Sequence, residues 1–240
     1  MLPSVAEKEK KDMAERVIKA ALLGFGTVGG GVYKVLKMQQ EEMVSKLGAR
    51  VELKKILVRN IEKAAQKTDD PSLLTNNWKE IVDDPEIEIV IELIGGIEPA
   101  RTYILEALEA GKNVIVEKPF TATAEQGQEL VDLARSKGLA ISVYQNRRWD
   151  SDFLTVREIL NKGLLGRLVE FESTFPRYRN FIKPGTWKET GELGGGLTYN
   201  LGAHIIDQAV QLLGVPDAVS PISTPFVQLS LIHISEPTRH

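Results

Sequence analysis

Short apolar runs separated by amphipathic stretches recur from Val17 to about Asn146. The runs are nearly continuous in valine and isoleucine, which is typical of strands buried on both faces of a parallel sheet. The strands that this pattern predicts are Ile18–Leu23, Val51–Val58, Ile87–Leu93, Asn113–Val116 and Ala140–Tyr144. Strands that alternate with helices build βαβ units, so the pattern predicts an α/β fold with a doubly wound parallel sheet.

Local signals also mark the ends of elements. Thr123 and Gln126 have the spacing of a capping box, which predicts a helix between the last two strands. Gly138 suits the left-handed position that follows a helix. The run Asp83-Asp84-Pro85 predicts a turn before the third strand.

After Asn146 the pattern changes character. It predicts a helix from Phe153 to Asn161, and an alternation of apolar and polar residues predicts a strand from Leu168 to Thr174. Three glycines, 194–196, precede a helix that reaches Leu213. We therefore predict a charged arm over residues 1–16, an α/β domain over 17–146 and a truncated α+β domain over 147–228.

The last residues have an unusual origin in this interpretation. Residues 229–239 are what a DNA string encodes that resembles a transposase adapter used in the preparation of sequencing libraries. The alternative is a natural strand and tail of mixed composition. We interpret residues 229–240 as an artefactual tail on a fragment of a longer reading frame, which removes His233 and His240 from the candidates for chemistry.

Composition narrows the possible functions. The 240 residues are 42% hydrophobic and 26% charged, carry a net charge of −3 and include no cysteine. This balance favours neither nucleic acid nor a membrane as a partner, and it excludes disulfides and thiol catalysis. The sequence contains no signal-peptide core and no apolar stretch long enough for a bilayer, so we predict a cytoplasmic protein.

A glycine motif follows the first predicted strand. In Gly24-Phe25-Gly26-Thr27-Val28-Gly29, the first glycine allows a tight turn, the second allows close approach of a pyrophosphate, and the third allows close packing of the next helix. This context predicts a Rossmann-type dinucleotide-binding domain; a glycine-rich turn without a ligand is the alternative. After the second strand, Arg59 stands where an acidic residue would bind the ribose of NAD, which favours NADP over NAD. A solvated surface arginine is the other interpretation.

Two further segments carry candidate catalytic groups. Lys118 follows the strand that ends near Val116, where its ammonium could stabilise a developing alkoxide beside a nicotinamide. Pro119 would fix the turn, and a cis bond there is a hypothesis. Far along the chain, Asn200 and His204 are four residues apart and would share one face of a helix. His204 suits a general acid or base, and the sequence offers no cluster at metal-ligand spacing.

From about Gly111 to Ser220 the chain resembles the Gfo/Idh/MocA family, the glucose-fructose oxidoreductase and inositol dehydrogenase group. The match is carried by Glu117-Lys118-Pro119, Gln145-Asn146-Arg147-Arg148-Trp149 and the block from Gly194 to Asp207. The resemblance implies an NAD(P)-dependent oxidoreductase for sugars or polyols, homo-oligomeric at full length. It also implies that Lys118 and His204 serve catalysis and that Asn146 and Arg147 line the cleft that binds cofactor and substrate. The family often has Asp where this chain has Asn200.

From about Ile18 to Ala110 the chain resembles homoserine dehydrogenase. The match is carried by Gly24 to Val32, Leu57-Val58-Arg59-Asn60 and the run from Glu92 to Arg101. This resemblance implies amino-acid biosynthesis with NAD(P)H, although the substrate-domain motifs of that family are not recognisable here. The two resemblances meet near residues 107–112, where either two natural halves recombined or short reads were joined wrongly.

The sequence therefore predicts an oxidoreductase that transfers a hydride between nicotinamide and a sugar or polyol. The alternatives are a homoserine dehydrogenase, a non-catalytic dinucleotide-binding module and a non-functional chimeric fragment. The predicted catalytic residues are Lys118, Asn200 and His204, and no metal site is predicted. The predicted cofactor-binding residues are Gly24, Phe25, Gly26, Thr27, Val28, Gly29, Arg59, Gly95, Glu117, Lys118, Asn146 and Arg147.

Overall fold

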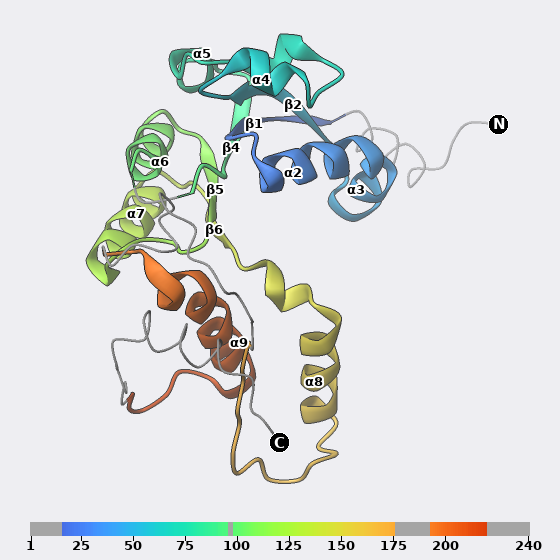
Figure 1. Ribbon diagram of the computed structural model, residues 1–240, viewed down its shortest axis with the longest axis vertical. Helices are drawn as coiled ribbons and strands as arrows, with labels where there is room; N and C mark the ends of the chain where they lie inside the picture. Colours follow the sequence, from blue (N-terminus) through green and yellow to red (C-terminus); the bar gives the residue numbers. More distant parts are fainter. Residues whose placement is uncertain (1–15, 96–97, 176–192, 220–240) are drawn as a thin grey trace, which may run out of the picture. The chain divides into compact units, whose positions relative to one another are not determined.

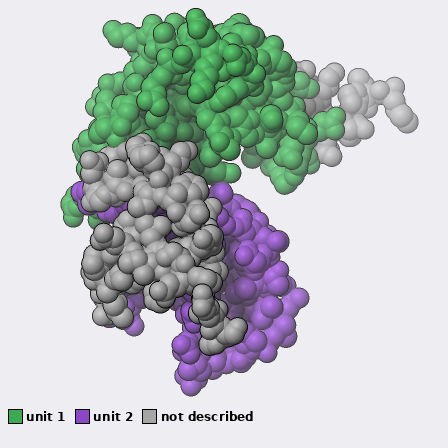
Figure 2. Space-filling view, viewed as in Figure 1, with its two compact units in different colours: residues 1–144 green, residues 145–240 purple. Residues whose placement is uncertain are grey.

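The computed structural model describes residues 16–95, 98–175 and 193–219, and Figure 1 shows the course of the chain. The chain divides into two compact units, residues 1–144 and residues 145–240 (Figure 2). Residues 1–15 of the predicted N-terminal arm and the whole predicted tail over residues 229–240 lie outside the described residues.

One six-stranded sheet forms the centre of the first unit, and every neighbouring pair of its strands runs parallel. The strands are β1 (Val17–Leu23), β2 (Arg50–Leu57), β3 (Leu74–Thr75), β4 (Ile87–Glu92), β5 (Asn113–Glu117) and β6 (Ile141–Tyr144). Their order across the sheet is β3-β2-β1-β4-β5-β6. The chain therefore changes direction across the sheet between β1 and β4, and ligands of open α/β sheets bind beside such a point. The predicted doubly wound α/β fold is confirmed.

The five predicted strands all occur, each within one residue of its expected ends. The sixth strand, β3, was not predicted because two residues are too few to show a period. It pairs with β2 at the edge of the sheet, where the backbone N–H of Val58 donates to the carbonyl of Thr75 at 2.8 Å.

Helices cover the sheet of the first unit. They are α2 (Thr27–Met38), α3 (Gln40–Leu47), α4 (Ile61–Ala65), α5 (Lys79–Val82), α6 (Ala100–Glu109) and α7 (Ala124–Ser136), with a 3₁₀ turn η1 (Pro71–Leu73). At the start of α7 the N–H of Gln126 donates to Thr123 Oγ1 at 3.3 Å, and the Gln126 side chain accepts from Ala122 at 3.2 Å. The predicted cap is confirmed, as is the left-handed Gly138 after the helix.

Alternate residues of β1 belong to two separate hydrophobic clusters. Ala21 and Leu23 lie in the larger cluster, with buried residues of α5, α6 and α7. Leu22 lies in the smaller cluster, with Tyr33 of α2 and Ala64 of α4. Because successive side chains of a strand point to opposite faces, the two clusters are the cores on the two sides of the sheet.

The described part of the second unit is helical. It contains a 3₁₀ turn η2 (Asn146–Trp149), helix α8 (Ser151–Asn161), a π-helical turn η4 (Thr198–Gly202) and helix α9 (Ala203–Leu213). The predicted helix over 153–161 is confirmed and starts two residues earlier. The predicted strand over 168–174 is wrong, since these residues form no strand. An alternating segment needs a paired neighbour to become a strand, and the described residues of this unit supply none.

Candidate functional site

The glycine loop between β1 and α2 has the backbone geometry that a phosphate site requires. Gly24 has a φ of +101°, a left-handed value that costs glycine little. A Cβ at Gly29 would lie 2.2 Å from the carbonyl oxygen of Gly24, so any side chain there would displace the loop. A Cβ at Gly26 would meet nothing within 4 Å, so the loop leaves open space where a pyrophosphate would approach.

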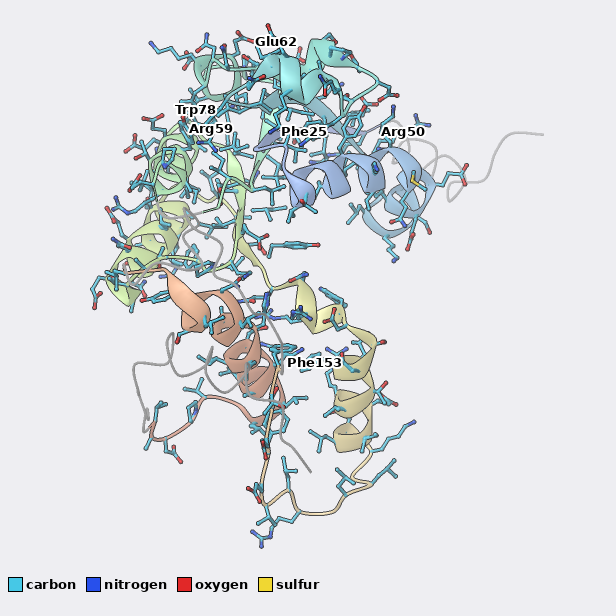
Figure 3. The ribbon with its side chains drawn as sticks, in the orientation of Figure 1. Phe25, Arg50, Arg59, Glu62, Trp78 and Phe153 are labelled. Atoms are coloured by element: carbon cyan, nitrogen blue, oxygen red, sulfur yellow. The ribbon has the colours of Figure 1, made fainter. Side chains whose placement is uncertain are left out.

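The start of α2 is suited to an anion. Gly26 is its N-cap residue and no side chain caps it, while Thr27 and Val28 at the first two helical positions are exposed. The backbone N–H groups of a first helical turn and the positive end of the helix dipole favour a phosphate. Phe25, labelled in Figure 3, is buried and packs edge-on against Tyr33 at 5.6 Å between ring centroids. Its side chain therefore anchors the loop, which leaves the backbone of the motif to meet a dinucleotide.

Arg59 occupies the position that bears on cofactor choice. It is exposed directly after Val58 at the end of β2 (Figure 3), and within the described part of the chain no ion pair or hydrogen bond engages its guanidinium. The next residue, Asn60, caps α4 by accepting from the N–H of Lys63 at 2.7 Å. Arg59 is thus available to a 2′-phosphate, and Asn60 is not an acid that would repel one.

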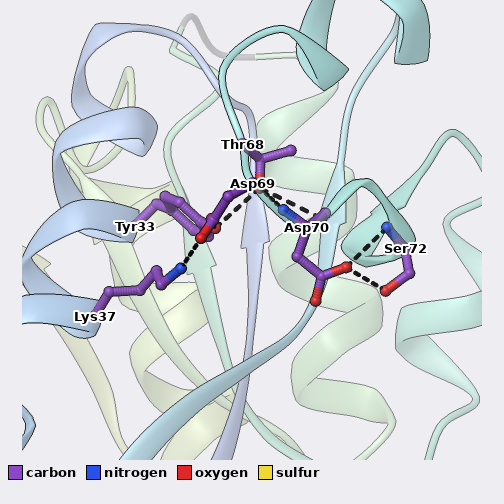
Figure 4. Close-up of polar contacts among 6 residues, drawn as sticks. All are labelled: Tyr33, Lys37, Thr68, Asp69, Asp70 and Ser72. Carbon is purple, nitrogen blue, oxygen red and sulfur yellow. Dashed lines mark hydrogen bonds and ion pairs between the residues drawn. The ribbon is translucent and has the colours of Figure 1, made fainter.

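A polar cluster that the sequence did not reveal holds the loop after α4 against α2 (Figure 4). Tyr33 and Lys37 of α2 both donate to the carboxylate of Asp69. The hydroxyl of Thr68 donates to the Tyr33 hydroxyl at 3.0 Å and accepts from the N–H of Asp70 at 3.0 Å. The hydrogen bonds from Lys37 and Tyr33 lower the pKa of Asp69 to about 2. The loop is therefore fixed by charge-assisted bonds.

Lys67, in the same loop, lies next to the glycine motif. Its ammonium donates to the carbonyl of Phe25 at 3.3 Å. A cation within hydrogen-bonding distance of the phosphate loop adds positive potential where a dinucleotide carries its charge. Sequence pattern could not have shown this contact, because it joins residues 42 positions apart.

The predicted lysine lies at the carboxyl end of β5, the neighbour of β4. Lys118 directly follows β5 and is only 9% exposed, and its bond to Pro119 is cis, as hypothesised. Glu117 is the last residue of β5, and Gly95, with a φ of +74°, lies in the loop after β4. These strands are neighbours, so the predicted residues of both loops lie on one edge of the sheet.

Glu92 is the last residue of β4, and the sequence analysis did not include it among the candidate site residues. It is 2% exposed and accepts from the N–H of Ile94 at 2.6 Å. Burial raises the pKa of Glu92. The sequence did contain a signal for Glu92. An acidic residue at the end of an otherwise apolar strand is unusual, because buried strand positions are normally apolar.

In the second unit, polar contacts join η2 to α9. Arg148 donates to both carboxylate oxygens of Asp207, from Nε at 2.8 Å and from Nη2 at 2.5 Å. Gln208 donates to the carbonyl of Arg147 at 3.1 Å. Asp207 therefore holds η2 to α9. Asn146 on the same turn is exposed.

The predicted pair Asn200 and His204 lies across the junction of the π-helical turn η4 and helix α9. Both side chains are buried, at 8% and 5% exposed. π-Helical turns occur frequently at functional sites, and residues four apart lie on one side of a helix. Arg147, on η2, bonds Asp150 at 2.9 Å and stacks its guanidinium on Phe175 at 4.8 Å.

The predicted residues thus form two groups. In the first unit, the glycine loop, Arg59, Gly95, Glu117 and Lys118 lie at the carboxyl ends of β1, β2, β4 and β5. In the second unit, contacts between η2 and α9 bring the segment of Asn146 and Arg147 to the helix that carries His204.

The described residues were searched for a metal site and for a membrane-spanning helix. They contain no group of three or more His, Cys, Asp or Glu side chains that could hold a metal ion. Over the same residues, none of the helices has both the length and the apolar character needed to cross a membrane.

Two family models match the chain. The model described as homoserine dehydrogenase, NAD binding domain, matches residues 24–144, and the model described as GFO/IDH/MocA C-terminal domain matches residues 153–228. The first model covers the glycine loop, Arg59 and Lys118, and the second covers His204.

Some individual relatives match across the regions of both family models, and others match about half of the chain. The scyllo-inositol 2-dehydrogenase (NADP(+)) IolW of Bacillus subtilis is 36% identical over 206 residues, covering 85% of this chain and 54% of its own length. Homoserine dehydrogenase of B. subtilis is 35% identical over 126 residues, covering 52% of this chain and 29% of its own. A solved Bacteroides fragilis protein, described as a candidate oxidoreductase, is 48% identical with a TM-score of 0.67, covering 85% of this chain and 54% of that one. The chain spans about half the length of IolW and of the B. fragilis protein.

Proposed function

Because this chain belongs to the Gfo/Idh/MocA-type oxidoreductases with an NAD-binding domain of the homoserine dehydrogenase type, we propose that its full-length protein transfers a hydride between a nicotinamide dinucleotide and the carbinol carbon of a sugar or polyol. The observation that carries the proposal is the buried Lys118, at the carboxyl edge of the sheet that also bears the glycine loop. The dinucleotide, when bound, supplies the hydride acceptor or donor.

Lys118 is the proposed electrostatic catalyst. Its ammonium would donate a hydrogen bond to the substrate oxygen and stabilise the negative charge that develops there. Burial at 9% exposure supports this role, because a charge acts more strongly where water is largely excluded.

His204 is the proposed general acid or base, with Asn200 as its neighbour one turn earlier. A buried imidazole can take the hydroxyl proton in oxidation and return it in reduction. Asn200 keeps a hydrogen-bonding group where the family often has an acid, but it lacks the charge that would raise the basicity of the histidine.

We propose NADP as the cofactor. The exposed Arg59 after β2 favours it, whereas Lys67 beside the glycine loop would favour the pyrophosphate of either dinucleotide. The relative IolW is named for NADP(+), which agrees with this choice. Arg59→Ala is expected to weaken NADPH binding more than NADH binding, and an unchanged ratio of the two affinities would contradict the cofactor proposal.

The dinucleotide site is tested first by a matched glycine pair. Gly29→Ala places a Cβ 2.2 Å from Gly24 O and is expected to lower NADPH affinity at least roughly tenfold, as measured by nicotinamide fluorescence. Gly31→Ala, two residues along the same helix, meets nothing within 4 Å and is expected to bind normally. Equal affinities in both variants would overturn the assignment of the loop.

Turnover by the full-length protein tests the reaction. We expect NADP-dependent oxidation of a polyol that falls at least about a hundredfold in Lys118→Ala and in His204→Ala, with NADPH binding retained. NADPH binding without turnover of any polyol would indicate a non-catalytic module instead. A homo-oligomeric full-length protein and a cytoplasmic location are further parts of the proposal, checked by light scattering and by cell fractionation.

Homoserine dehydrogenase is the second candidate, favoured by the family match over residues 24–144. It is less favoured because residues 153–228 match the GFO/IDH/MocA C-terminal domain, the region where a substrate domain follows. Assaying homoserine beside a set of polyols separates the two, since turnover of homoserine alone would replace the first proposal.

A further inference from the structure

Glu92 lies at the centre of the carboxyl edge of the sheet. In the strand register it stands beside Leu23 of β1 on one side and Val116 of β5 on the other. Its side chain is 2% exposed, and no ion pair engages it within the described residues. Burial of a carboxylate costs free energy unless hydrogen bonds replace its hydration, so this position needs compensating partners.

Backbone N–H groups are those partners. Ile94 donates to Glu92 Oε1 at 2.6 Å, and the backbone N–H groups of Gly95 and Glu117 act on the same carboxylate in the direction that lowers its pKa. Ile94 and Gly95 belong to the loop after β4. Glu117 ends β5 and directly precedes Lys118. One buried side chain therefore links the loops that follow two neighbouring strands.

The glycine loop rests on the same segment. A Cβ at Gly24 would lie 3.0 Å from the carbonyl oxygen of Leu93 and 3.2 Å from the N of Ile94. The turn after β1 thus packs on the backbone of Leu93 and Ile94, which directly follows Glu92. The loops after β1, β4 and β5 all meet at or next to this carboxylate.

The chemistry of Glu92 agrees with a positional role. Burial is the main cause that raises its pKa and the nearby Glu117 carboxylate adds to it, while the three backbone hydrogen bonds act in the opposite direction. If this position served only apolar packing, a leucine would be more favourable than a glutamate. An acid at this position is explained by the N–H groups that it orders.

We propose that Glu92 is a positioning residue for the nicotinamide half of the dinucleotide site. By accepting bonds from the loops after β4 and β5, it sets the place of Lys118. The inference rests on the proposed function. Arg59 follows β2, which is separated from β4 by β1, so Glu92 is expected to matter for the whole dinucleotide and little for its adenosine half.

The test compares Glu92→Gln with Glu88→Gln in the full chain. Glu92→Gln keeps the size of the side chain but removes its charge and one acceptor oxygen. Glu88 is on the same strand, and its side chain is 42% exposed and forms only a 3.8 Å ion pair with Arg16, so it is the matched control. We expect roughly tenfold faster hydrogen exchange at the amides of Ile94, Gly95 and Glu117 in Glu92→Gln, and no change at Leu22.

Binding supplies the readout that a general loss of structure would not reproduce. In Glu92→Gln, NADPH affinity is expected to fall roughly tenfold, the factor that loss of one charge-assisted hydrogen bond produces, while affinity for 2′,5′-ADP stays within about twofold. Glu92→Asp, which keeps the charge on a shorter side chain, is expected to recover part of the NADPH affinity and replaces Glu92→Gln if that variant does not fold.

The outcomes separate this inference from the proposed function. Unchanged exchange and NADPH affinity in Glu92→Gln, with normal binding by the wild-type chain, would overturn the positioning role alone. An equal loss of NADPH and 2′,5′-ADP would also overturn it, because it would indicate a general structural role. Failure of the wild-type chain to bind either ligand would overturn the proposed function and this inference with it.

Discussion

The interior of the first unit and that of the second are stabilised in different ways. In the first unit, β1 alone contributes four residues with 0% exposure, and two apolar clusters cover the two faces of its sheet. In the described part of the second unit, Phe153 is the only buried apolar side chain, whereas the polar residues Asn200, His204 and Gln208 are buried. The first unit is therefore stabilised by apolar packing, and the described part of the second unit is stabilised largely by polar contacts.

This difference bears on function. A parallel sheet covered on both faces is a rigid support, so loops at its carboxyl edge can keep the geometry that a dinucleotide needs. The η2–α9 contact depends on one bidentate ion pair and one side chain-to-backbone bond. Such contacts are directional, and they orient residues without burying much apolar area.

The largest effect is expected from a leucine deletion in the first unit. Leu108 is 0% exposed, so Leu108→Ala is expected to lower the free energy of unfolding by about 2–5 kcal/mol in urea denaturation. Leu165, in the second unit, is 63% exposed, and Leu165→Ala is expected to cost less than about 0.5 kcal/mol. Similar losses from both variants would remove the contrast between the units.

A smaller effect is expected from the ion pair of the second unit. Asp207→Ala leaves the half-buried guanidinium of Arg148 without its carboxylate, which should lower the local stability of α9 by about 1–2 kcal/mol. Hydrogen exchange of the α9 amides measures this. Glu158→Ala removes the exposed pair with Lys162, and its expected effect is below about 0.5 kcal/mol. If both variants behave alike, polar contacts do not hold η2 to α9.

The smallest effect is expected from the exposed cluster of the first unit. The pKa of Asp69 is lowered to about 2, so its carboxylate stabilises the fold above the ordinary aspartate pKa of about 4, and this contribution disappears as the pH falls toward 2. Asp69→Asn should therefore flatten the acid side of the stability profile between about pH 4 and 2. Acid titration followed by circular dichroism, at low and high salt, measures it. A profile that keeps the wild-type slope would show that the cluster adds no stability.

The fold of the first unit was largely predictable because buried strands and capped helices leave local patterns. The five predicted strands and the cap at Thr123 were found where the pattern placed them. The error over 168–174 has the same origin, since alternation indicates a strand but does not supply the neighbour that must pair with it. The two residues of β3 were too few to leave a pattern.

In the candidate site too, local features could be predicted from the sequence and long-range contacts could not. The glycine loop could be predicted because its requirement is local: Gly24 needs a left-handed backbone and Gly29 needs the absence of a side chain. Glu92 and Lys67 could not be assigned from pattern, because their contacts reach Glu117 and Phe25, which lie 25 and 42 positions away.

The sequence by itself determined five of the six strands of the sheet, the glycine-rich turn after β1 and the candidate groups Lys118 and His204. These depend on the burial or backbone needs of single segments, which periodicity and residue type record directly. Only the tertiary structure decided that Glu92 links the loops after β4 and β5, that Asp69 joins α2 to the loop after α4, and that Arg148 pairs with Asp207. Polar pairs of this kind depend on strand order and on the approach of distant segments, and many pairings are compatible with the same local pattern.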